Sequence, residues 1–208
     1  MRLELAERLI CPGDHARTPL IVIALETADR DLRRGSVGCM TCHREGRVLD
    51  GSLEFGAPVT TAAGSVPLRE PSEDLLFRLT ALLALDDPGQ PILVGETYRE
   101  VAPLLAERFD AAVAVIGAAG ASPRGVGHVL GAGERIPFAD GCFHAAALDD
   151  RMGAAAMADA VRAVRVGGRV LGDAGSPLPP RVRELARDAQ HWVGEVQAAP
   201  TVVPLRRA

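Results

Sequence analysis

The stretch Pro91-Ile-Leu-Val-Gly-Glu-Thr-Tyr-Arg99 decides how the second half of this chain is interpreted. A short apolar run leads directly into a polar segment, which is the pattern of a buried strand that turns into a helix. At such a turn a nucleotide-type cofactor is normally met by several glycines, because a residue without a Cβ lets backbone N–H groups approach a ligand closely. Here only Gly95 is present, so the strand and the helix are predicted without the usual glycine loop.

Apolar strands alternate with helices on both sides of this stretch. Ser72 precedes two acidic residues and a leucine-rich run, which indicates an N-cap and a first helical turn. The expected strands are 92–95, 111–117, 127–130, 143–148 and 168–172, and the expected helices are 72–85, 98–109, 152–164 and 179–190, with a final hairpin over 192–206. This alternation predicts an α/β fold with a mostly parallel, truncated Rossmann-like sheet, since only seven residues (118–124) are left for one crossover.

Residues 1–56 are organised differently from the rest of the chain. Apolar runs at 20–25 and 46–51, the second ending in an Asp-Gly turn, predict short strands and no long helix. A segment rich in Ala, Thr, Gly, Ser and Pro follows. The sequence therefore predicts an N-terminal β module over 1–56, a linker over 57–71 and an α/β domain over 72–208.

Three of the four cysteines, with a histidine, lie in two short turns of the N-terminal module. The first turn is Cys11-Pro-Gly-Asp-His15 and the second is Gly38-Cys-Met-Thr-Cys42. Two such turns flanking a hairpin are the usual way to hold a tetrahedral Zn²⁺. Cys11, Cys39 and Cys42 are the predicted ligands, with either His15 or Asp14 as the fourth, because a fourth cysteine is missing at Asp14.

Two other interpretations of these cysteines exist. The module could lack metal and keep three unpaired thiols. Cys39-Met-Thr-Cys-His43 also matches the pattern for covalent c-type haem attachment, but that chemistry normally follows export. The charged residues among the first ten argue against a secretory signal, so haem is disfavoured and a cytoplasmic location is expected.

Composition excludes some classes of partner. The chain has 208 residues, 48% hydrophobic and 24% charged, with a net charge of −4. A negative net charge without a polybasic segment offers no broad surface for nucleic acid or for an anionic membrane. No apolar run approaches the roughly 20 residues that span a bilayer. We therefore expect neither nucleic acid nor membrane as a direct partner.

Residues 8–55 resemble the small zinc-ribbon family whose members bind and activate methyltransferases. The resemblance rests on Arg8-Leu-Ile-Cys-Pro12, on the Cys39-Met-Thr-Cys42 turn and on Arg47-Val-Leu-Asp-Gly-Ser-Leu-Glu-Phe55. In that family Asp-Gly-Ile-Pro closes the module, whereas this chain has Asp50-Gly-Ser-Leu53. The resemblance covers about a quarter of the chain and implies a module that docks onto other proteins.

Residues 90–175 resemble the class I S-adenosylmethionine-dependent methyltransferases. Glu134-Arg-Ile-Pro-Phe-Ala-Asp-Gly-Cys-Phe143 is similar to the segment that leads into their fourth strand, and Ala163-Val-Arg-Val-Gly-Gly-Arg-Val-Leu171 to the turn before their fifth. These are scaffold motifs, since Pro and Gly pairs of this kind turn the chain. The resemblance implies the fold more directly than the activity.

The positions that hold the cofactor in that family differ in this chain. A side chain at Glu96 replaces a glycine after Gly95, no carboxylate precedes Gly117 at the end of the second strand, and Ala132 stands where an aspartate usually contacts the adenine. Each missing polar contact costs roughly 1–3 kcal/mol of binding. We therefore treat Gly95, Glu96, Gly117 and Ala132 as vestigial positions and expect S-adenosylmethionine not to serve as cofactor, with no catalytic residue identified.

Three functions follow as hypotheses from these observations. The first is a non-catalytic pseudo-methyltransferase that acts through protein contacts, as a homodimer or with another protein. The second is an active methyltransferase with an unconventional cofactor site, and the third is a small-molecule-binding module that uses Glu96, Tyr98 or Asp149. The leucine-rich helix at 75–85 and the hairpin from Trp192 onward are the expected contact elements, with Trp192 becoming more buried on assembly.

Overall fold

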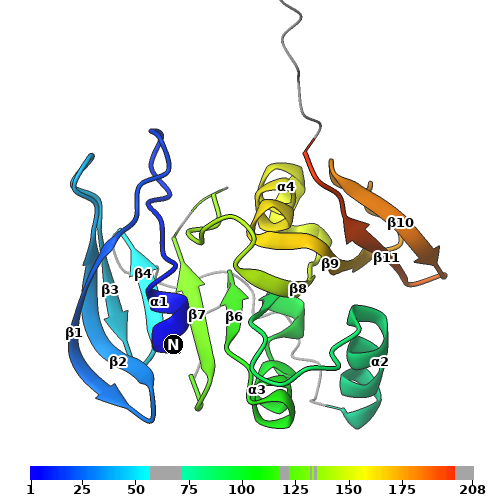
Figure 1. Ribbon diagram of the computed structural model, residues 1–208, viewed down its shortest axis with the longest axis horizontal. Helices are drawn as coiled ribbons and strands as arrows, with labels where there is room; N and C mark the ends of the chain where they lie inside the picture. The colour runs from blue at the N-terminus through cyan, green and yellow to red at the C-terminus, as the bar shows by residue number, and fades with distance from the viewer. Residues whose placement is uncertain (57–71, 118–121, 132, 134, 200–208) are drawn as a thin grey trace, which may run out of the picture.

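The computed structural model describes residues 1–56, 72–117, 122–131, 133 and 135–199. These residues form one sheet of eleven strands in the order β1-β2-β3-β4-β7-β6-β5-β8-β9-β11-β10 (Figure 1). The strands are β1 (Ile21–Ala28), β2 (Asp31–Gly38), β3 (Glu45–Leu49), β4 (Ser52–Phe55), β5 (Ile92–Gly95), β6 (Val113–Ile116), β7 (Val126–Leu130), β8 (Phe143–Ala147), β9 (Val164–Asp173), β10 (Val182–Arg187) and β11 (His191–Val196). The helices are α1 (Leu3–Ala6), α2 (Glu73–Leu83), α3 (Ala102–Phe109) and α4 (Gly153–Ala163), with 3₁₀ turns at Glu96–Tyr98 and Asp150–Met152.

The centre of the sheet is parallel, as the alternation of strands and helices predicted. β7, β6, β5, β8 and β9 pair in parallel, and all four residues of β5 and of β6 are buried. A strand that is covered on both faces has apolar residues at successive positions, which explains why the sequences of these strands are apolar throughout. The fold is therefore a mixed α/β fold with a Rossmann-like, mostly parallel central sheet.

The two faces of the sheet carry separate cores, because successive side chains of a strand point to opposite faces. Ile92 and Val94 of β5 pack with α2 and α3, whose Leu79 and Leu105 are buried. Leu93 points the other way, into a core shared with α1, α4 and the N-terminal strands. The helix expected over 72–85 is α2, and Ser72 caps it by accepting a hydrogen bond from the Leu75 N–H at 3.1 Å.

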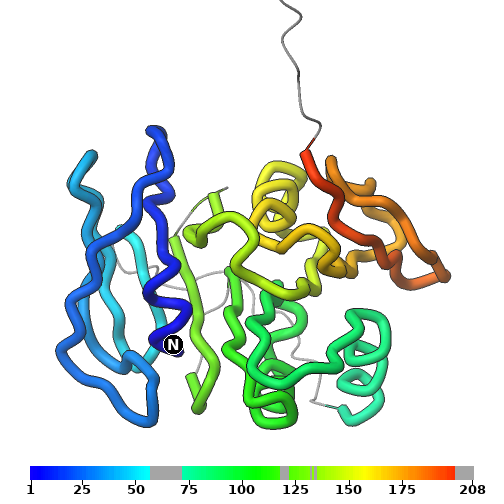
Figure 2. The backbone as a smooth tube through the Cα atoms, in the orientation of Figure 1, coloured from blue at the N-terminus to red at the C-terminus, as the bar shows by residue number. Residues whose placement is uncertain are grey.

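The N-terminal module continues the same sheet. β4 pairs in parallel with β7, with Ser52 opposite His128 and Leu53 opposite Val129. β1 to β4 are antiparallel, and Figure 2 shows these strands at one end of the molecule and β10 and β11 at the other. The predicted linker over 57–71 lies outside the described residues.

Two expectations for the C-terminal region were wrong, the helix over 179–190 and the exposure of Trp192. Residues 182–187 form strand β10, not part of a helix over 179–190, because β11 offers a partner along its whole length and a backbone ladder overrides the helical periodicity. The final hairpin is consequently β10–β11, and residues 200–206 of the expected hairpin are outside the described part. Trp192 is 0% exposed and packs against Gly172, so it cannot become more buried on assembly.

The leucine-rich stripe of α2 is also already covered. Leu79 and Leu83 are buried in the core beneath the sheet, and Leu75, Leu76 and Leu82 pack partly against it. The stripe therefore serves the chain's own core. Within the described ranges, none of the helices has both the length and the apolar character needed to cross a bilayer.

Candidate metal centre and the carboxyl ends of the strands

Cys11, His15, Cys39 and Cys42 bring their ligand atoms together, all within 4.8 Å of one another. The Sγ atoms of Cys11 and Cys42 are 3.5 Å apart, and the Cys39 Sγ lies 3.5 Å from the His15 Nε2. A tetrahedral Zn²⁺ with Zn–S bonds of about 2.3 Å places neighbouring sulfurs about 3.8 Å apart. The cluster therefore fits a zinc ion with three thiolates and one imidazole.

Backbone geometry in the two turns aims the sulfurs at this point. The Gly13 N–H donates to the Cys11 Sγ at 3.3 Å, and the Thr41 N–H donates to the Cys39 Sγ at 3.4 Å. Such N–H groups stabilise negative charge on sulfur, which a metal-bound thiolate carries. The His15 Nδ1 lies 2.6 Å from the Ala16 carbonyl oxygen. Because a carbonyl can only accept, Nδ1 carries the proton and Nε2 is left to coordinate.

The thiols differ in acidity. Backbone hydrogen bonding, first from Cys42, lowers the pKa of Cys39 to about 6, while burial raises the pKa of Cys11 to about 11. Metal binding requires the deprotonated form of each thiol and releases the protons that remain. A zinc ion arriving at this site would thus find Cys39 ready as a thiolate and displace the proton of Cys11.

Asp14 points away from the cluster. Its carboxylate Oδ1 accepts a hydrogen bond from the Arg135 Nη2 at 2.8 Å, and its side chain is fully exposed. Arg135 Nη1 also donates to the Gly13 carbonyl oxygen. The first turn is therefore held from outside by Arg135, and of the two candidates for the fourth ligand it is His15 that joins the three sulfurs.

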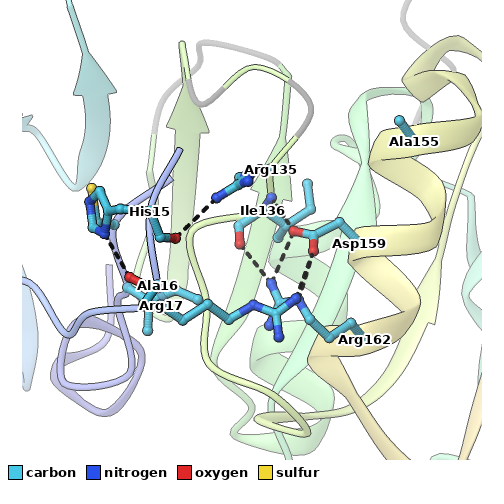
Figure 3. Close-up of a pocket in the computed structure, with 10 residues that line it drawn as sticks. His15, Ala16, Arg17, Arg135, Ile136, Ala155, Asp159 and Arg162 are labelled. Carbon is cyan, nitrogen blue, oxygen red and sulfur yellow. Dashed lines mark hydrogen bonds and ion pairs between the residues drawn. The ribbon is translucent and has the colours of Figure 1, made fainter. Parts of the chain in front are cut away.

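A polar cavity of about 490 Å³ lies beside the cluster, between the first turn and α4 (Figure 3). Arg162 of α4 is one of the residues that line this cavity. The guanidinium donates to Asp159 through Nε and Nη2, to Asp140 through Nη1, and to the carbonyl oxygens of Phe138 and Ile136. All the donors of this buried cation are thus used within the protein.

Asp159 and Arg162 were missed by sequence reasoning. Hydrogen bonds from Arg162 hold the pKa of Asp159 below its usual range although burial raises it. Their spacing of three residues on a helix was a weak signal, since ion pairs at this spacing are common on exposed faces. Burial, which makes this pair important, is a property of the tertiary fold alone.

The carboxyl end of β5 is occupied by Asp149, which is buried. Its Oδ2 accepts hydrogen bonds from the Thr97 N–H and hydroxyl, both at 3.2 Å, and its Oδ1 accepts one from the Arg151 N–H at 3.1 Å. A Cβ added to Gly95 would lie 2.4 Å from Oδ2. Gly95 thus allows the carboxylate to pack against the strand end, where a ligand would otherwise approach.

Two of the remaining predicted positions, Glu96 and Gly117, lie close to each other. Glu96 pairs with Arg99 at 3.7 Å and faces Gly117, whose φ of 94° falls in the region that favours glycine. Ala132 lies outside the described residues. Asp149 caps the turn that follows it, and the Asp173 carboxylate accepts a hydrogen bond from the Asp150 N–H, so both carboxylates support local turns.

His144 lies near the amino end of β8, at the opposite end of the parallel strands from Asp149. It is the second residue of β8, whereas ligands of parallel sheets meet the carboxyl ends of the strands. Burial lowers its pKa, which keeps the imidazole neutral. His144 is therefore part of the sheet and does not lie at the carboxyl ends of the strands.

Comparisons with known proteins concern the fold. No family model matches the chain, and no curated protein matches it. Among solved structures, geranyl diphosphate methyltransferase in complex with S-adenosylmethionine is 18% identical, with a TM-score of 0.41 over 48% of this chain and 47% of that one. The antibiotic-resistance methyltransferase Kmr is 14% identical, with a TM-score of 0.42 over 58% of this chain and 92% of that one. A methyltransferase from Bacillus halodurans C-125 is 22% identical, with a TM-score of 0.38 over 47% of this chain and 49% of that one.

At these identities the likeness concerns the fold alone, and the chain spans less than half the length of the geranyl diphosphate methyltransferase. The neighbours nevertheless contradict one expectation. They include structures solved with S-adenosylmethionine and with S-adenosyl-L-homocysteine, so the exclusion of this cofactor from missing side-chain contacts was wrong. The physical reason is that backbone groups at strand ends also hold ligands, and no side-chain motif reports them.

Proposed function

We propose that this protein is a zinc-stabilised, non-catalytic member of the methyltransferase-like fold that acts through protein contacts. The observation that carries the proposal is the set of hydrogen bonds on Asp149 at the carboxyl end of β5. A catalytic acid or base needs free hydrogen-bonding capacity toward a substrate. Asp149 receives three donors from its own chain, and Glu96 is paired with Arg99.

The zinc ion in this proposal is structural. Cys11, His15, Cys39 and Cys42 supply four ligands, which closes a tetrahedral coordination shell and leaves no position for a substrate or a reactive water. The ion would join the turn before β1 to the turn between β2 and β3. The role of the ion is therefore to stabilise the N-terminal module.

The resemblance of the N-terminal module to zinc ribbons supports a role in binding, and the contacts of the module limit which surface could serve it. Its resemblance to zinc ribbons that activate methyltransferases suggests docking, and here β4 docks on β7 of its own chain. That strand edge is consequently used within the molecule. A further partner would have to meet a different surface of the module.

The proposal is tested by measuring methyl transfer separately from cofactor binding. Zinc-loaded protein is incubated with S-adenosylmethionine and protein or metabolite fractions of the native cell, and S-adenosylhomocysteine is quantified. We expect no product above the blank, whatever affinity calorimetry finds for the cofactor. Product that disappears in both Asp149→Ala and Glu96→Ala, but not in the exposed control Glu73→Ala, would show catalysis at this site and refute the proposal.

A further inference from the structure

Strand β1 presents an apolar stripe at a free edge of the sheet. Ile21, Ile23 and Leu25 are 50%, 55% and 75% exposed. A spacing of two residues places Ile21 and Ile23 on one face of the strand, and Leu25 follows at a β-bulge, where the register against β2 shifts between Ala24 and Glu26. Among the described strands, β1 pairs with β2 alone. An edge of this kind offers both unpaired backbone groups and apolar side chains to another strand.

The opposite edge of the sheet is protected by charge. β10 carries Arg183 and Arg187, which pair with Glu195 at 3.2 Å and with Glu184 at 2.7 Å. Charged side chains on an edge strand resist pairing with a further strand. β1 has a single charged residue, Glu26, so the two edges of one sheet differ in the feature that controls association.

The backbone of β1 is oriented for pairing on its free side. A Cβ added to Gly35 of β2 would lie 2.4 Å from the Ile23 carbonyl oxygen, so the Ile23 carbonyl points toward β2. In an antiparallel ladder the neighbouring residues point the other way. The backbone groups of Val22 and Ala24 consequently face outward. Their register against β2 is regular, since the irregularities of this pair begin after Ala24.

We propose that β1 pairs with β1 of a second copy of this chain, antiparallel and across a two-fold axis at Ile23. This inference rests on the proposed function and names the partner as the chain itself. Val22 of each copy then hydrogen-bonds with Ala24 of the other. Ile23 faces Ile23 of the second copy in a non-hydrogen-bonded pair, where side chains approach most closely.

The register is selected by the apolar stripe. Centred on Ile23, the pairing places Ile23 opposite Ile23 within the regular part of the strand, and it places Ile21 of each copy opposite the exposed Leu25 of the other. A shift of the axis to Ala24 leaves Ile21 opposite Thr27, and a shift to Val22 leaves Leu25 opposite Pro19. Centring on Ile23 also places Glu26 opposite Leu20, which keeps the two carboxylates apart.

The test is the oligomeric state of the zinc-loaded full chain by sedimentation and light scattering. We expect a concentration-dependent dimer. Ile23→Lys and Ile23→Asp each place like charges at the axis and should each be monomeric, while an equimolar mixture of the two places opposite charges there and should restore the dimer. Leu185→Lys, which puts the same charge on exposed β10, is the matched control and should leave the dimer intact.

Three outcomes would overturn the inference: a wild type that is monomeric up to about 100 μM, a dimer that survives Ile23→Lys, or a mixture that stays monomeric although each variant retains its zinc and its circular dichroism. None of these bears on methyl transfer. If the protein is monomeric and transfers no methyl group, the dimer proposal fails and the proposed function stands. If it is dimeric and does transfer methyl groups, the proposed function fails and the dimer proposal stands.

Discussion

The zinc-ligand cluster and the carboxyl end of β5 both bring polar side chains together, but they differ in how hydrogen-bond donors and acceptors are matched. At the cluster three sulfurs and an imidazole nitrogen face one another, and all of them are electron-pair donors to a metal. At β5 one carboxylate faces three hydrogen-bond donors of the same chain. Electron-pair donors that converge are suited to a cation, whereas acceptors matched with donors of the same chain are already satisfied.

Removing the metal is the strongest way to break this comparison. Zinc bound to small ribbons contributes on the order of 10 kcal/mol to folding, so a chelator should unfold the N-terminal module while the parallel strands keep their circular dichroism. Cys39→Ser should reduce the zinc content of the purified protein to near zero. Cys142→Ser is the control, because Cys142 is buried outside the cluster. The Cys142→Ser protein should therefore keep its full zinc content. Full zinc content in Cys39→Ser would contradict the assignment.

Arg162 lines the cavity beside the zinc-ligand cluster, and its loss should have the next largest effect. Arg162→Met removes the guanidinium donors from Asp159 and from two carbonyl oxygens, and breaking a buried ion pair costs about 3–5 kcal/mol. Asp159 keeps only the Ile136 N–H and the longer contact with Arg17. Urea denaturation measures this loss. The double variant Arg162→Met with Asp159→Leu should recover part of it. Arg17→Ala, at a half-exposed arginine on the same cavity, should cost less than about 1 kcal/mol.

Asp149→Ala tests whether the hydrogen bonds at the carboxyl end of β5 stabilise the fold. The substitution removes the acceptor for the Thr97 N–H and hydroxyl and for the Arg151 N–H, so we expect a loss of roughly 1–3 kcal/mol in the free energy of unfolding. Thr97→Val, which keeps the backbone bond and removes the hydroxyl, should cost less. A stability gain in Asp149→Ala would indicate a carboxylate strained for ligand binding and would reverse the comparison.

The smallest expected effect separates the two candidates for the fourth zinc ligand. Asp14→Ala should leave the zinc stoichiometry unchanged and alter stability by less than about 0.5 kcal/mol, because its carboxylate is exposed and contacts Arg135 instead of the sulfurs. His15→Ala should lower zinc affinity in a competition assay with a chromogenic chelator. The reverse result for these two variants would exchange their roles.

The fold was predictable wherever it depends on local periodicity. The runs at 92–95 and 113–116 are apolar throughout because those strands are buried on both faces, and Ser72 with its acidic followers marked α2. The helix expected over 179–190 failed because the alternative, a ladder with β11, depends on a strand that lies beyond it in the chain. Exposed segments with ambiguous patterns take the structure that their neighbours offer.

By itself the sequence determined the α/β class, the spacing of Cys11, Cys39 and Cys42, and the absence of a glycine loop after Gly95, since each of these is a property of adjacent residues. Only the tertiary structure decided that His15 and not Asp14 faces the sulfurs, that β4 extends the central sheet through β7, and that Asp149 reaches Thr97. Some of these contacts join residues that are far apart in the chain. The choice between His15 and Asp14 depends on the direction in which each of two adjacent side chains points. Local propensity carries no information about such contacts, because their energies depend on burial and on partners supplied by the rest of the fold.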